Sequence, residues 1–464
     1  MTYASTRGLI TEALTESGYL VDQTAVDDGG GGLAAPLVTP QLYTPTVTIT
    51  QLAAGVYTQG SSLLQADNAA FRYSNALMRS IATGSPTQLG TAYAARDRVA
   101  PTTSAQGNKW AVEFDYTGTT LEVHLSVASG AYYWFWVDDR AISATPARAP
   151  SPISGATFRI LQLNLGSSAK RKIRIEGQGV NAIFNGVRSG SGVLAEACEA
   201  DRLPILAWVG DSYGDGRKAT NELMGFVRTL GRLRNLEAWQ FPSYGGQGLV
   251  YESSAGLKHI SRMATDLAPI SPDPEMIVIQ GSINDSLGSW SGNVGPAMVA
   301  AIEQAQTDFP NATIFATSPL FASTPTSTVR SIAAEIEAAV AASAPSVSYI
   351  DAVEWFTNTS GAYLDADGNH PNQDGHDAFA TRMANEIAYS GDTIACRIDS
   401  MSGSEGEVAN RISDRSTHLL TLPPGSSVTT EDQFYVIGRG TYEVTAVREH
   451  TGEFSTVFEA VEFA

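Results

Sequence analysis

Residues 205–216 constrain the fold of this 464-residue chain more than any other stretch. The stretch begins with an unbroken apolar run, Ile205–Val209, and continues as Gly210-Asp211-Ser212 followed by further glycines. An apolar run without alternation indicates a strand buried on both faces, as in a parallel sheet. A serine just past the carboxyl end of such a strand lies where open α/β sheets place their chemistry. An ordinary strand-to-turn junction is the alternative, because Gly, Asp and Ser all form turns.

From about residue 203 onward, strand-like runs alternate with longer helical patterns. Parallel strands need crossovers of this kind, so five consecutive units predict a parallel sheet. Right-handed crossovers then make the region a three-layer α/β/α domain of the flavodoxin type. The predicted strands are 205–209, 236–241, 276–280, 313–317 and 347–351, and the predicted helices are 217–233, 256–267, 295–308, 327–343 and 374–389.

Residues 41–200 have a β pattern, with short alternating runs separated by Gly, Ser and Pro. This pattern predicts an antiparallel β-sandwich. The aromatic run 132–137 could stack on sugar rings, but large aromatic residues more often fill a core, and we favour the core. His124 alternates with apolar neighbours and is interpreted as a surface or core histidine rather than a ligand. The predicted strands are 47–50, 110–116, 121–127, 132–137, 158–165 and 172–176.

The charge of the chain argues against nucleic acid as a partner. It carries 29 Lys and Arg against 48 Asp and Glu, a net charge of -19. Neutralising phosphates needs clustered cations, and the largest basic cluster is Lys170-Arg171-Lys172. The two cysteines, Cys198 and Cys396, form neither a disulfide framework nor a zinc site; they could be bridged, but two reduced thiols are favoured. We predict no metal and no cofactor.

Targeting signals are not apparent. Residues 1–18 lack a basic segment followed by an apolar core, so no signal peptide is predicted. No apolar run approaches the length of a membrane span. The expected product is made in the cytoplasm, and export within a virus particle stays open.

Polar blocks follow the predicted strands of the α/β region. A serine hydroxyl is a weak nucleophile that needs a base, a group that orients the base, and donors for the oxyanion. Side chains of all these kinds are present. The blocks are Ser212 after the first strand, Gly245-Gly246-Gln247-Gly248 after the second, Gly281-Ser282-Ile283-Asn284-Asp285 after the third, and Asp365-Ala366-Asp367-Gly368-Asn369-His370-Pro371 after the fifth.

In order and placement, these blocks together with Gly375-His376 resemble those of the SGNH (GDSL-type) hydrolases. The resemblance covers about residues 203–390. It implies that Ser212 is the nucleophile, His370 the base, and Asp367 the residue that holds the imidazole. It also implies an oxyanion hole made by the backbone N–H of Ser212, the N–H of Gly246 and the side-chain amide of Asn284.

The third block departs from the pattern of this family. The family commonly has Gly-x-Asn-Asp, whereas here Ser282 takes the place of the glycine and Gly281 precedes it by one residue. The second block is ambiguous as well. Gly245, Gly246 or Gly248 could supply the donor, and we prefer Gly246.

The spacing Asp365-x-Asp367-x-Asn369 also resembles the start of a calcium loop. The glycine falls at the wrong position and the loop ends at His376 rather than Glu, so we favour the triad. A plain surface loop is the other alternative.

Four further polar residues have structural roles in this prediction. Asp211 orders the nucleophile turn, and Asp285 is a turn residue. His259 lies on a helix and is solvated. His376 packs at the start of the last helix, which Asp374 caps.

The two ends of the chain carry a second resemblance. The segments 396–398, 422–428 and 436–447 resemble the small β-barrel of bacteriophage head–tail connector (stopper) proteins. The first strand and Asp-Gly turn of those proteins are similar to residues 19–32. The resemblance implies one module split between the chain ends, with the other domains inserted into it, and insertion at exposed loops is tolerated. A β appendage that stabilises an ordinary esterase is the alternative.

The predicted fold class is therefore multidomain, with four parts. Residues 1–40 begin a connector-like β module, and residues 41–200 form a jelly-roll-like sandwich that could bind carbohydrate. Residues 201–392 form the SGNH hydrolase domain, and residues 393–464 complete the connector-like module as a small β-barrel.

The predicted function is a serine esterase of a phage particle that removes acetyl or other short acyl groups from a host envelope glycan. A sandwich before an SGNH-like domain is similar in arrangement to some carbohydrate esterases. A lipid-type esterase and a non-catalytic structural or receptor-binding virion protein are the alternatives. The expected partners are an acylated glycan or lipid ester and other virion proteins, and a homo-oligomer stays open.

Overall fold

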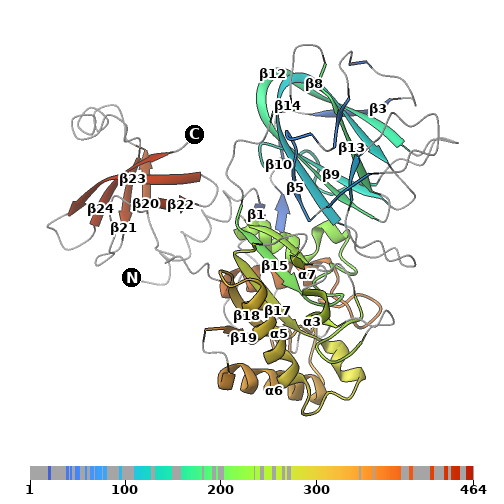
Figure 1. Ribbon diagram of the computed structural model, residues 1–464, viewed down its shortest axis with the longest axis vertical. Coiled ribbons are helices and arrows are strands. Elements are labelled where there is room, and N and C mark those ends of the chain that lie inside the picture. The colour runs from blue at the N-terminus through green and yellow to red at the C-terminus, as the bar shows by residue number, and fades with distance from the viewer. Residues whose placement is uncertain are drawn as a thin grey trace. The chain divides into compact units, whose positions relative to one another are not determined.

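The protein is described from a computed structural model (Figure 1). The described residues are 19–21, 38–40, 42–43, 47–52, 58–59, 63–66, 68–75, 77–80, 93–96, 109–126, 131–148, 158–179, 182–190, 195–196, 203–234, 236–240, 245–252, 258–263, 267–268, 273–343, 346–357, 359, 361–387, 397–400, 418–422, 433–436, 440–449 and 456–462. Cys198 and Cys396 lie outside them. Within this set, no helix combines the length and the apolar character needed to cross a membrane.

The chain divides into two compact units, one made of residues 1–19 with 387–464 and the other of residues 20–386. The described part of the first unit is an antiparallel sheet with the strand order β20-β21-β24-β23-β22. Closure of this sheet into a barrel and the connector-like module stay predictions. Its strands are β20 (Arg397–Ser400), β21 (His418–Leu422), β22 (Gln433–Val436), β23 (Gly440–Glu449) and β24 (Thr456–Glu462).

The second unit contains a five-stranded parallel sheet, as predicted. Its order is β16-β15-β17-β18-β19. The chain adds β16 on one side of β15 and the later strands on the other side, so the order of strand addition reverses at β15. This is the flavodoxin order, in which the reversal opens a crevice at the carboxyl ends of the strands. The strands are β15 (Ile205–Val209), β16 (Glu237–Gln240), β17 (Met276–Gly281), β18 (Thr313–Pro319) and β19 (Ser348–Ile350).

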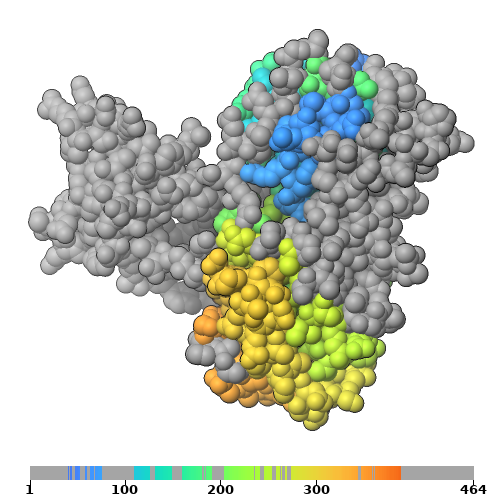
Figure 2. All heavy atoms as spheres, in the orientation of Figure 1, coloured from blue at the N-terminus to red at the C-terminus, as the bar shows by residue number. Residues whose placement is uncertain are grey.

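The described helices of this region form two contacting sets. Helix α2 packs against α7, while α5 packs against both α3 and α6. Right-handed crossovers place these sets on opposite faces of the sheet. Helices α5 and α6 also form part of the surface in Figure 2, coloured yellow to orange. The helices are α2 (Phe226–Arg234), α3 (His259–Arg262), α5 (Val294–Asp308), α6 (Ser327–Ser343) and α7 (Gln373–Glu386), with 3₁₀ helices η2 (Glu222–Met224) and η4 (Ile283–Leu287).

The first predicted helix, 217–233, begins too early. Residues 211–219 fold instead as consecutive turns, and α2 starts only at Phe226. Gly216 adopts a φ of 81°, a left-handed conformation that a helix cannot include. The second predicted helix, 256–267, is described only in part, and there α3 spans His259–Arg262.

Residues before 200 form an antiparallel sheet region of twelve described strands. The sandwich arrangement of this region stays a prediction. The strands are β3 (Thr48–Leu52), β4 (Leu64–Gln65), β5 (Arg72–Ser74), β6 (Leu77–Ser80), β7 (Tyr93–Arg96), β8 (Lys109–Ser126), β9 (Tyr132–Val137), β10 (Arg140–Ala141), β11 (Ala147–Arg148), β12 (Phe158–Gln178), β13 (Ile183–Arg188) and β14 (Ala195–Glu196); β1 (Tyr19–Val21) and β2 (Val38–Pro40) pair separately.

Two pairs of predicted strands are in fact single long strands. The segments 110–116 and 121–127 are joined in β8, and the segments 158–165 and 172–176 are joined in β12. Gly118 and Gly166 suggest turns in the sequence, but β8 and β12 stay paired on both sides of a register shift between Asn164 and Ala169. A bulge of this kind bends a pair of strands without ending it.

Strand β9 is buried on both faces, in agreement with the core interpretation of its aromatic run. Tyr133 and Phe135 pack in the apolar core of the antiparallel region. Trp134 and Trp136 are also buried, and the guanidinium of Arg232 lies 4.6 Å and 5.1 Å from the centres of their rings. These indole rings therefore contact an arginine of helix α2.

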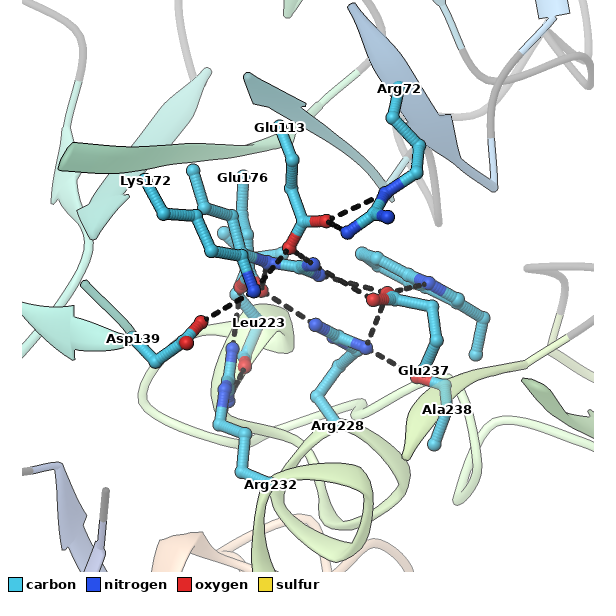
Figure 3. Close-up of polar contacts among 12 residues, drawn as sticks. Arg72, Glu113, Asp139, Lys172, Glu176, Leu223, Arg228, Arg232, Glu237 and Ala238 are labelled. Carbon is cyan, nitrogen blue, oxygen red and sulfur yellow. Dashed lines mark hydrogen bonds and ion pairs between the residues drawn. The ribbon is translucent and has the colours of Figure 1, made fainter. Parts of the chain in front are cut away.

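A buried ionic cluster joins the antiparallel region to the α/β region (Figure 3). Arg174 of β12 lies 2.7 Å from Glu113 of β8 and 2.8 Å from Glu237 of β16. Glu176 of β12 lies 2.6 Å from Arg228 of α2. Buried charges are tolerated only when they are paired and hydrogen-bonded, so these contacts fix which surfaces of the two regions meet.

We predict that acid destabilises the fold through this cluster. Burial alone would raise the pKa of Glu176, but Arg228, Arg232 and Arg174 lower it to about 2, below the ordinary value of 4.5. A carboxylate with a lowered folded-state pKa contributes stability above its unfolded pKa and loses that contribution as the pH falls through the folded value. The free energy of unfolding in urea should therefore decrease from pH 4.5 to pH 2.

A Glu176→Gln variant tests the source of this decrease. It should be less stable than the wild type at pH 7 by about 3 kcal/mol, because three guanidinium groups lose a buried partner, and its pH dependence should be flatter. Glu354→Gln, which removes the exposed ion pair with Arg330, is the control and should change the pH profile much less than Glu176→Gln does. Parallel profiles for the wild type and Glu176→Gln would contradict the prediction.

Candidate active site

Ser212, His370 and Asp367 lie together at the carboxyl ends of the parallel strands. The His370 Nε2 atom is 2.9 Å from the Ser212 Oγ atom, and the His370 Nδ1 atom is 2.8 Å from the Asp367 Oδ2 atom. An Nδ1–H that donates to the carboxylate leaves Nε2 with a lone pair facing the serine hydroxyl. The structure thus brings the three residues into the geometry of a nucleophile, a base and an orienting acid.

The loop that carries Asp367 keeps its carboxylate ionised. Its Oδ1 atom accepts hydrogen bonds from the backbone N–H groups of Asn369 and His370, both at 2.9 Å. Burial would raise the pKa of Asp367, but these two N–H groups and the His370 ring lower it well below the ordinary range. One carboxylate oxygen is therefore held by the loop and the other by the imidazole.

Asp211 lies beneath the nucleophile and has no exposed surface. Its carboxylate accepts hydrogen bonds from the Tyr213 N–H at 3.0 Å, the Gln280 amide at 2.9 Å and the Ser282 hydroxyl at 2.6 Å. Burial raises the pKa of Asp211, and the hydrogen bonds from Ser282, Tyr213 and Gln280 oppose that rise. The expectation that Asp211 orders the turn agrees with these contacts.

Three buried glutamine amides hold the nucleophile turn from neighbouring segments. Gln240 at the end of β16 donates to the Asp211 carbonyl at 2.6 Å, and Gln247 donates to the Gly210 carbonyl at 3.0 Å. Gln280 of β17 holds the Asp211 side chain and accepts a hydrogen bond from the Trp208 indole at 2.8 Å. The backbone position of the serine thus depends on three segments from outside its own turn.

The second block lies against the serine. A Cβ atom on Gly245 would approach the Ser212 Cβ atom to 2.9 Å, so only glycine fits there without a shift. Gly246 follows with a φ of 76°. A Cβ atom on Gly248 would approach the Asp285 carboxylate to 2.3 Å. The assignment of the Gly246 N–H to the oxyanion hole stays a prediction.

Asp285 does more than form a turn, contrary to the sequence interpretation. It is fully buried, and its carboxylate accepts hydrogen bonds from the backbone N–H groups of Leu249, Val250 and Tyr251 at 2.8 to 3.1 Å. Burial raises the pKa of Asp285, while these N–H groups lower it. The third block thereby fixes the loop that follows the second block.

Asn284, the predicted oxyanion donor, lies in the third block and is partly exposed. Its side-chain amide donates to the Gln247 carbonyl at 3.0 Å and to the Ser282 hydroxyl at 3.1 Å. Ser282, which replaces the common glycine of the family pattern, also accepts from the Asn284 N–H at 3.1 Å. Its hydroxyl therefore links the amide of Asn284 to the carboxylate of Asp211. The role of Asn284 as an oxyanion donor stays a prediction.

His376 packs at the start of the last helix, as expected, but Asp374 does not cap that helix. Asn372 is the cap, because its side chain accepts from the Gly375 N–H at 2.9 Å. The His376 ring is buried, donates to the Arg217 carbonyl at 2.9 Å and accepts from the Phe226 N–H at 3.3 Å. Burial lowers its pKa to about 4, so the ring is neutral near pH 7.

His259 is not solvated, which corrects the sequence interpretation. Its side chain has no exposed surface, and burial lowers its pKa to about 4. The flanking Lys258 and Arg262 suggested a polar face, but the His259 side chain is buried where it begins the short helix α3.

Tyr213 and Lys218 also contribute to the site, and neither was predicted from the sequence. The buried Tyr213 hydroxyl donates to the Asn369 carbonyl at 2.6 Å, so it ties the nucleophile turn to the histidine loop. The Lys218 ammonium lies 3.0 Å from the Asp365 carboxylate and 3.6 Å from that of Asp367. Tyr213 directly follows the serine, and its apolar ring beside a polar motif is the one signal that could have revealed it.

The loop of Asp365 and Asp367 presents its carboxylates to other groups of the protein. Its two carboxylates face an ammonium, backbone N–H groups and an imidazole. Within the part of the chain that is described, no group of three or more His, Cys, Asp and Glu side chains is arranged to hold a metal ion. The arrangement can activate a hydroxyl by proton transfer to an imidazole.

The comparisons with known proteins identify the domain that carries this site. Residues 208–378 match the GDSL-like Lipase/Acylhydrolase family and form a domain of that family. The matched segment includes Ser212, Asn284, Asp367 and His370. No curated protein matches the chain.

Solved structures are similar to this chain at low sequence identity, and the first of them shares its fold. A salicylyl-acyltransferase, SsfX3, from a tetracycline biosynthetic pathway is 16% identical, with a TM-score of 0.54, covering 72% of this chain and 99% of its own. A family two carbohydrate esterase from Clostridium thermocellum is 17% identical, with a TM-score of 0.47, covering 63% and 96%. An acetyl xylan esterase, Est2A, from the rumen bacterium Butyrivibrio proteoclasticus is 14% identical, with a TM-score of 0.39, covering 73% and 97%.

We predict that Ser282→Ala weakens both the fold and the site. The buried Asp211 carboxylate loses one donor, which should lower the free energy of unfolding by about 1–3 kcal/mol. The amide of Asn284 also loses a partner that orients it. Urea denaturation and the rate of ester hydrolysis measure the two effects. Ser286→Ala is the matched control, because the Ser286 hydroxyl donates only to the Ile283 carbonyl of the same turn. Equal effects of the two substitutions would contradict the prediction.

Proposed function

We propose that this chain, whose residues 208–378 form a GDSL-like lipase/acylhydrolase domain, is a serine esterase that hydrolyses carboxylic esters. The observation that carries the proposal is the continuous hydrogen-bonded chain from the Ser212 hydroxyl through His370 to Asp367. The distances of 2.9 Å and 2.8 Å allow proton transfer from the hydroxyl without rearrangement of the loops.

In the proposed reaction, Ser212 attacks the ester carbonyl carbon while its proton passes to the Nε2 atom of His370. The imidazolium that forms is stabilised by the Asp367 carboxylate at Nδ1. The same Nε2 proton then goes to the departing alkoxide as the tetrahedral intermediate collapses. A water molecule, deprotonated by His370, repeats the sequence on the acyl-enzyme and releases the acid.

The developing oxyanion is proposed to bind the N–H groups of Ser212 and Gly246 and the amide of Asn284. Donors held in place before the reaction stabilise such a charge because they need no reorganisation. The close approach of Gly245 to Ser212 supports a position of the second block beside the reacting carbonyl. The hydrogen bond from Ser282 to Asp211 supports a fixed position of the third block.

For the substrate, we propose acetyl or other short acyl esters on a glycan of a host cell envelope. The sequence between the blocks contains no long apolar segment of the kind that covers long acyl chains. We further propose that the protein is a component of a phage particle. The resemblance of residues 396–398, 422–428 and 436–447 to connector proteins is the ground for this proposal.

Ser212→Ala should abolish the esterase activity. Because the hydroxyl is the nucleophile, hydrolysis of p-nitrophenyl acetate should fall by at least about 10³-fold, while the thermal unfolding midpoint stays near that of the wild type. Equal rates for the wild type and the variant would remove the esterase proposal and favour a structural or receptor-binding virion protein.

Asp367→Asn should preserve the fold and slow catalysis. An amide in place of the carboxylate no longer holds the Nδ1–H tautomer, so kcat should fall on the order of 10³- to 10⁴-fold, as in a serine-protease triad. Asp365→Asn is the matched control on the same loop. It removes a contact with Lys218 but none with the imidazole, so its kcat should change by less than about tenfold. A larger loss in Asp365→Asn than in Asp367→Asn would contradict the assignment.

An acyl-length series separates the substrate classes. The p-nitrophenyl esters of acetate, butyrate, octanoate and palmitate should show a kcat/KM that is highest for acetate and declines with chain length. A maximum at octanoate or palmitate would overturn the short-acyl proposal and favour the lipid-type esterase.

A further inference from the structure

Lys109 of the antiparallel region is buried against the turn that carries the nucleophile. It is the first residue of β8, and its side chain is 3% exposed. Its ammonium lies 2.7 Å from the carboxylate of Asp215, whose side chain is 2% exposed, and also donates to the main-chain carbonyl of Asp215. A charge from one region is thus fully desolvated against the backbone of the other.

Asp215 belongs to the same closed turn as the nucleophile. Its N–H donates to the Asp211 carbonyl at 3.1 Å, and the N–H of Arg217 donates to the Ser212 carbonyl at 3.1 Å. The backbone of Asp215 is therefore held by Asp211 through its N–H and by Lys109 through its carbonyl. A shift of this carbonyl would move the peptide groups on which the position of Ser212 depends.

Lys109 is itself fixed to the core of the antiparallel region. The side-chain amide of the buried Asn75 donates to the Lys109 carbonyl at 2.7 Å. The next residue, Trp110, has no exposed surface and packs in the apolar core. The ammonium therefore reaches the turn from a rigid anchor.

The antiparallel region also holds the far end of the segment that follows the serine. Arg174 and Glu176 of β12 pair with Glu237, Arg228 and Arg232, which lie on α2 and β16 (Figure 3). The chain from residue 215 to residue 237 is thus tied to the antiparallel region at both ends. Such a contact differs from that of an appended binding module, which would leave the catalytic turn complete without it.

We propose that Lys109 is a positioning residue for the Ser212 nucleophile, so that the antiparallel region completes the active site of the hydrolase domain. The proposal rests on the esterase function proposed above. Lys109 fixes the turn that presents the serine to His370 and does not itself touch the substrate.

Other charged groups near Lys109 determine the choice of variants. Glu222, Arg217 and His376 surround the pair, and one carboxylate oxygen of Glu222 is buried without a hydrogen-bond partner. Burial and the charge of Asp215 raise the pKa of Glu222 to about 7, and Lys109 opposes that rise. Lys109→Met alone would leave Asp215 buried and unpaired, which costs stability. The double variant Lys109→Met/Asp215→Asn removes both charges. It still lacks the hydrogen bond from the lysine ammonium to the Asp215 carbonyl.

The experiment compares the wild type with Lys109→Met, Lys109→Met/Asp215→Asn, and Asn75→Gly, which frees the lysine backbone without a change of charge. Arg171→Met is the matched control, because Arg171 is a buried cation of the same region whose partners are carbonyl and hydroxyl groups far from the turn in sequence. The measurements are kcat and KM for p-nitrophenyl acetate, the rate at which a fluorophosphonate labels Ser212, thermal unfolding, and amide hydrogen exchange of residues 211–217.

The double variant should fold, lose about tenfold or more in kcat and in labelling rate at nearly constant KM, and exchange the amides of residues 211–217 faster. Asn75→Gly should show a smaller loss in the same direction. Arg171→Met should lower the unfolding midpoint but keep kcat within about twofold. Wild-type kcat and exchange in the folded double variant would overturn the proposal, and so would an equal loss of kcat in Arg171→Met.

Failure of the esterase proposal would be seen separately. In that case the wild type would show no Ser212-dependent hydrolysis or labelling. The exchange of residues 211–217 needs no substrate, so faster exchange in the double variant would still support Lys109 as the residue that holds the turn, and unchanged exchange would overturn it.

Discussion

The desolvated carboxylate of Asp211 is the constraint on which the candidate active site depends. A buried carboxylate is stable only when donors surround it, and here the donors come from its own turn, from β17 and from the residue after β17. These donors meet only when β15 and β17 are paired in the observed register. The same hydrogen bonds that satisfy Asp211 therefore set Ser212 beside the second and third blocks. The hydrogen bonds that stabilise the sheet around Asp211 are therefore also the ones that set the geometry of the site.

A second set of desolvated charges fixes the antiparallel region against the α/β region, as Asp211 fixes the loops of the site against one another. The cluster around Arg174 and Glu176 combines partners from both regions. Arg174 pairs with Glu176 of its own region and with Glu237, and Glu176 also pairs with Arg228. Replacing such a cluster by apolar residues can be neutral for stability, so its value lies in specifying one mutual orientation. That orientation brings Lys109 to the nucleophile turn.

The parts of the fold that the sequence predicted well are those with a local physical signal. The run Ile205–Val209 is continuously apolar and the segment Ser327–Ser343 is rich in alanine, and the structure has both at the predicted bounds. The triad residues could be placed at one sheet edge because the carboxyl ends of parallel strands meet there. Contacts between distant segments gave no such signal. Sequence spacing does not predict the contact of Lys109 with Asp215 or that of Tyr213 with Asn369. Burial rather than a local pattern brings these residues together. The long strands β8 and β12 were divided in two for the same reason, since pairing outweighed the turn preference of glycine.

The partners in the ionic cluster are synthesised at different times, and this affects how the antiparallel region folds on the ribosome. A ribosome completes β12, with Arg174 and Glu176, roughly 60 residues before Glu237 is translated. Until α2 and β16 have emerged, Arg174 and Glu176 can pair with each other but lack Glu237 and Arg228, so the remaining hydrogen-bonding groups of this pair stay in water. That face of the nascent sheet must then remain hydrated and unpacked. The ionic face of the antiparallel region thus completes its pairing only after the start of the α/β region has left the exit tunnel, although the apolar core of the antiparallel region consists of its own residues.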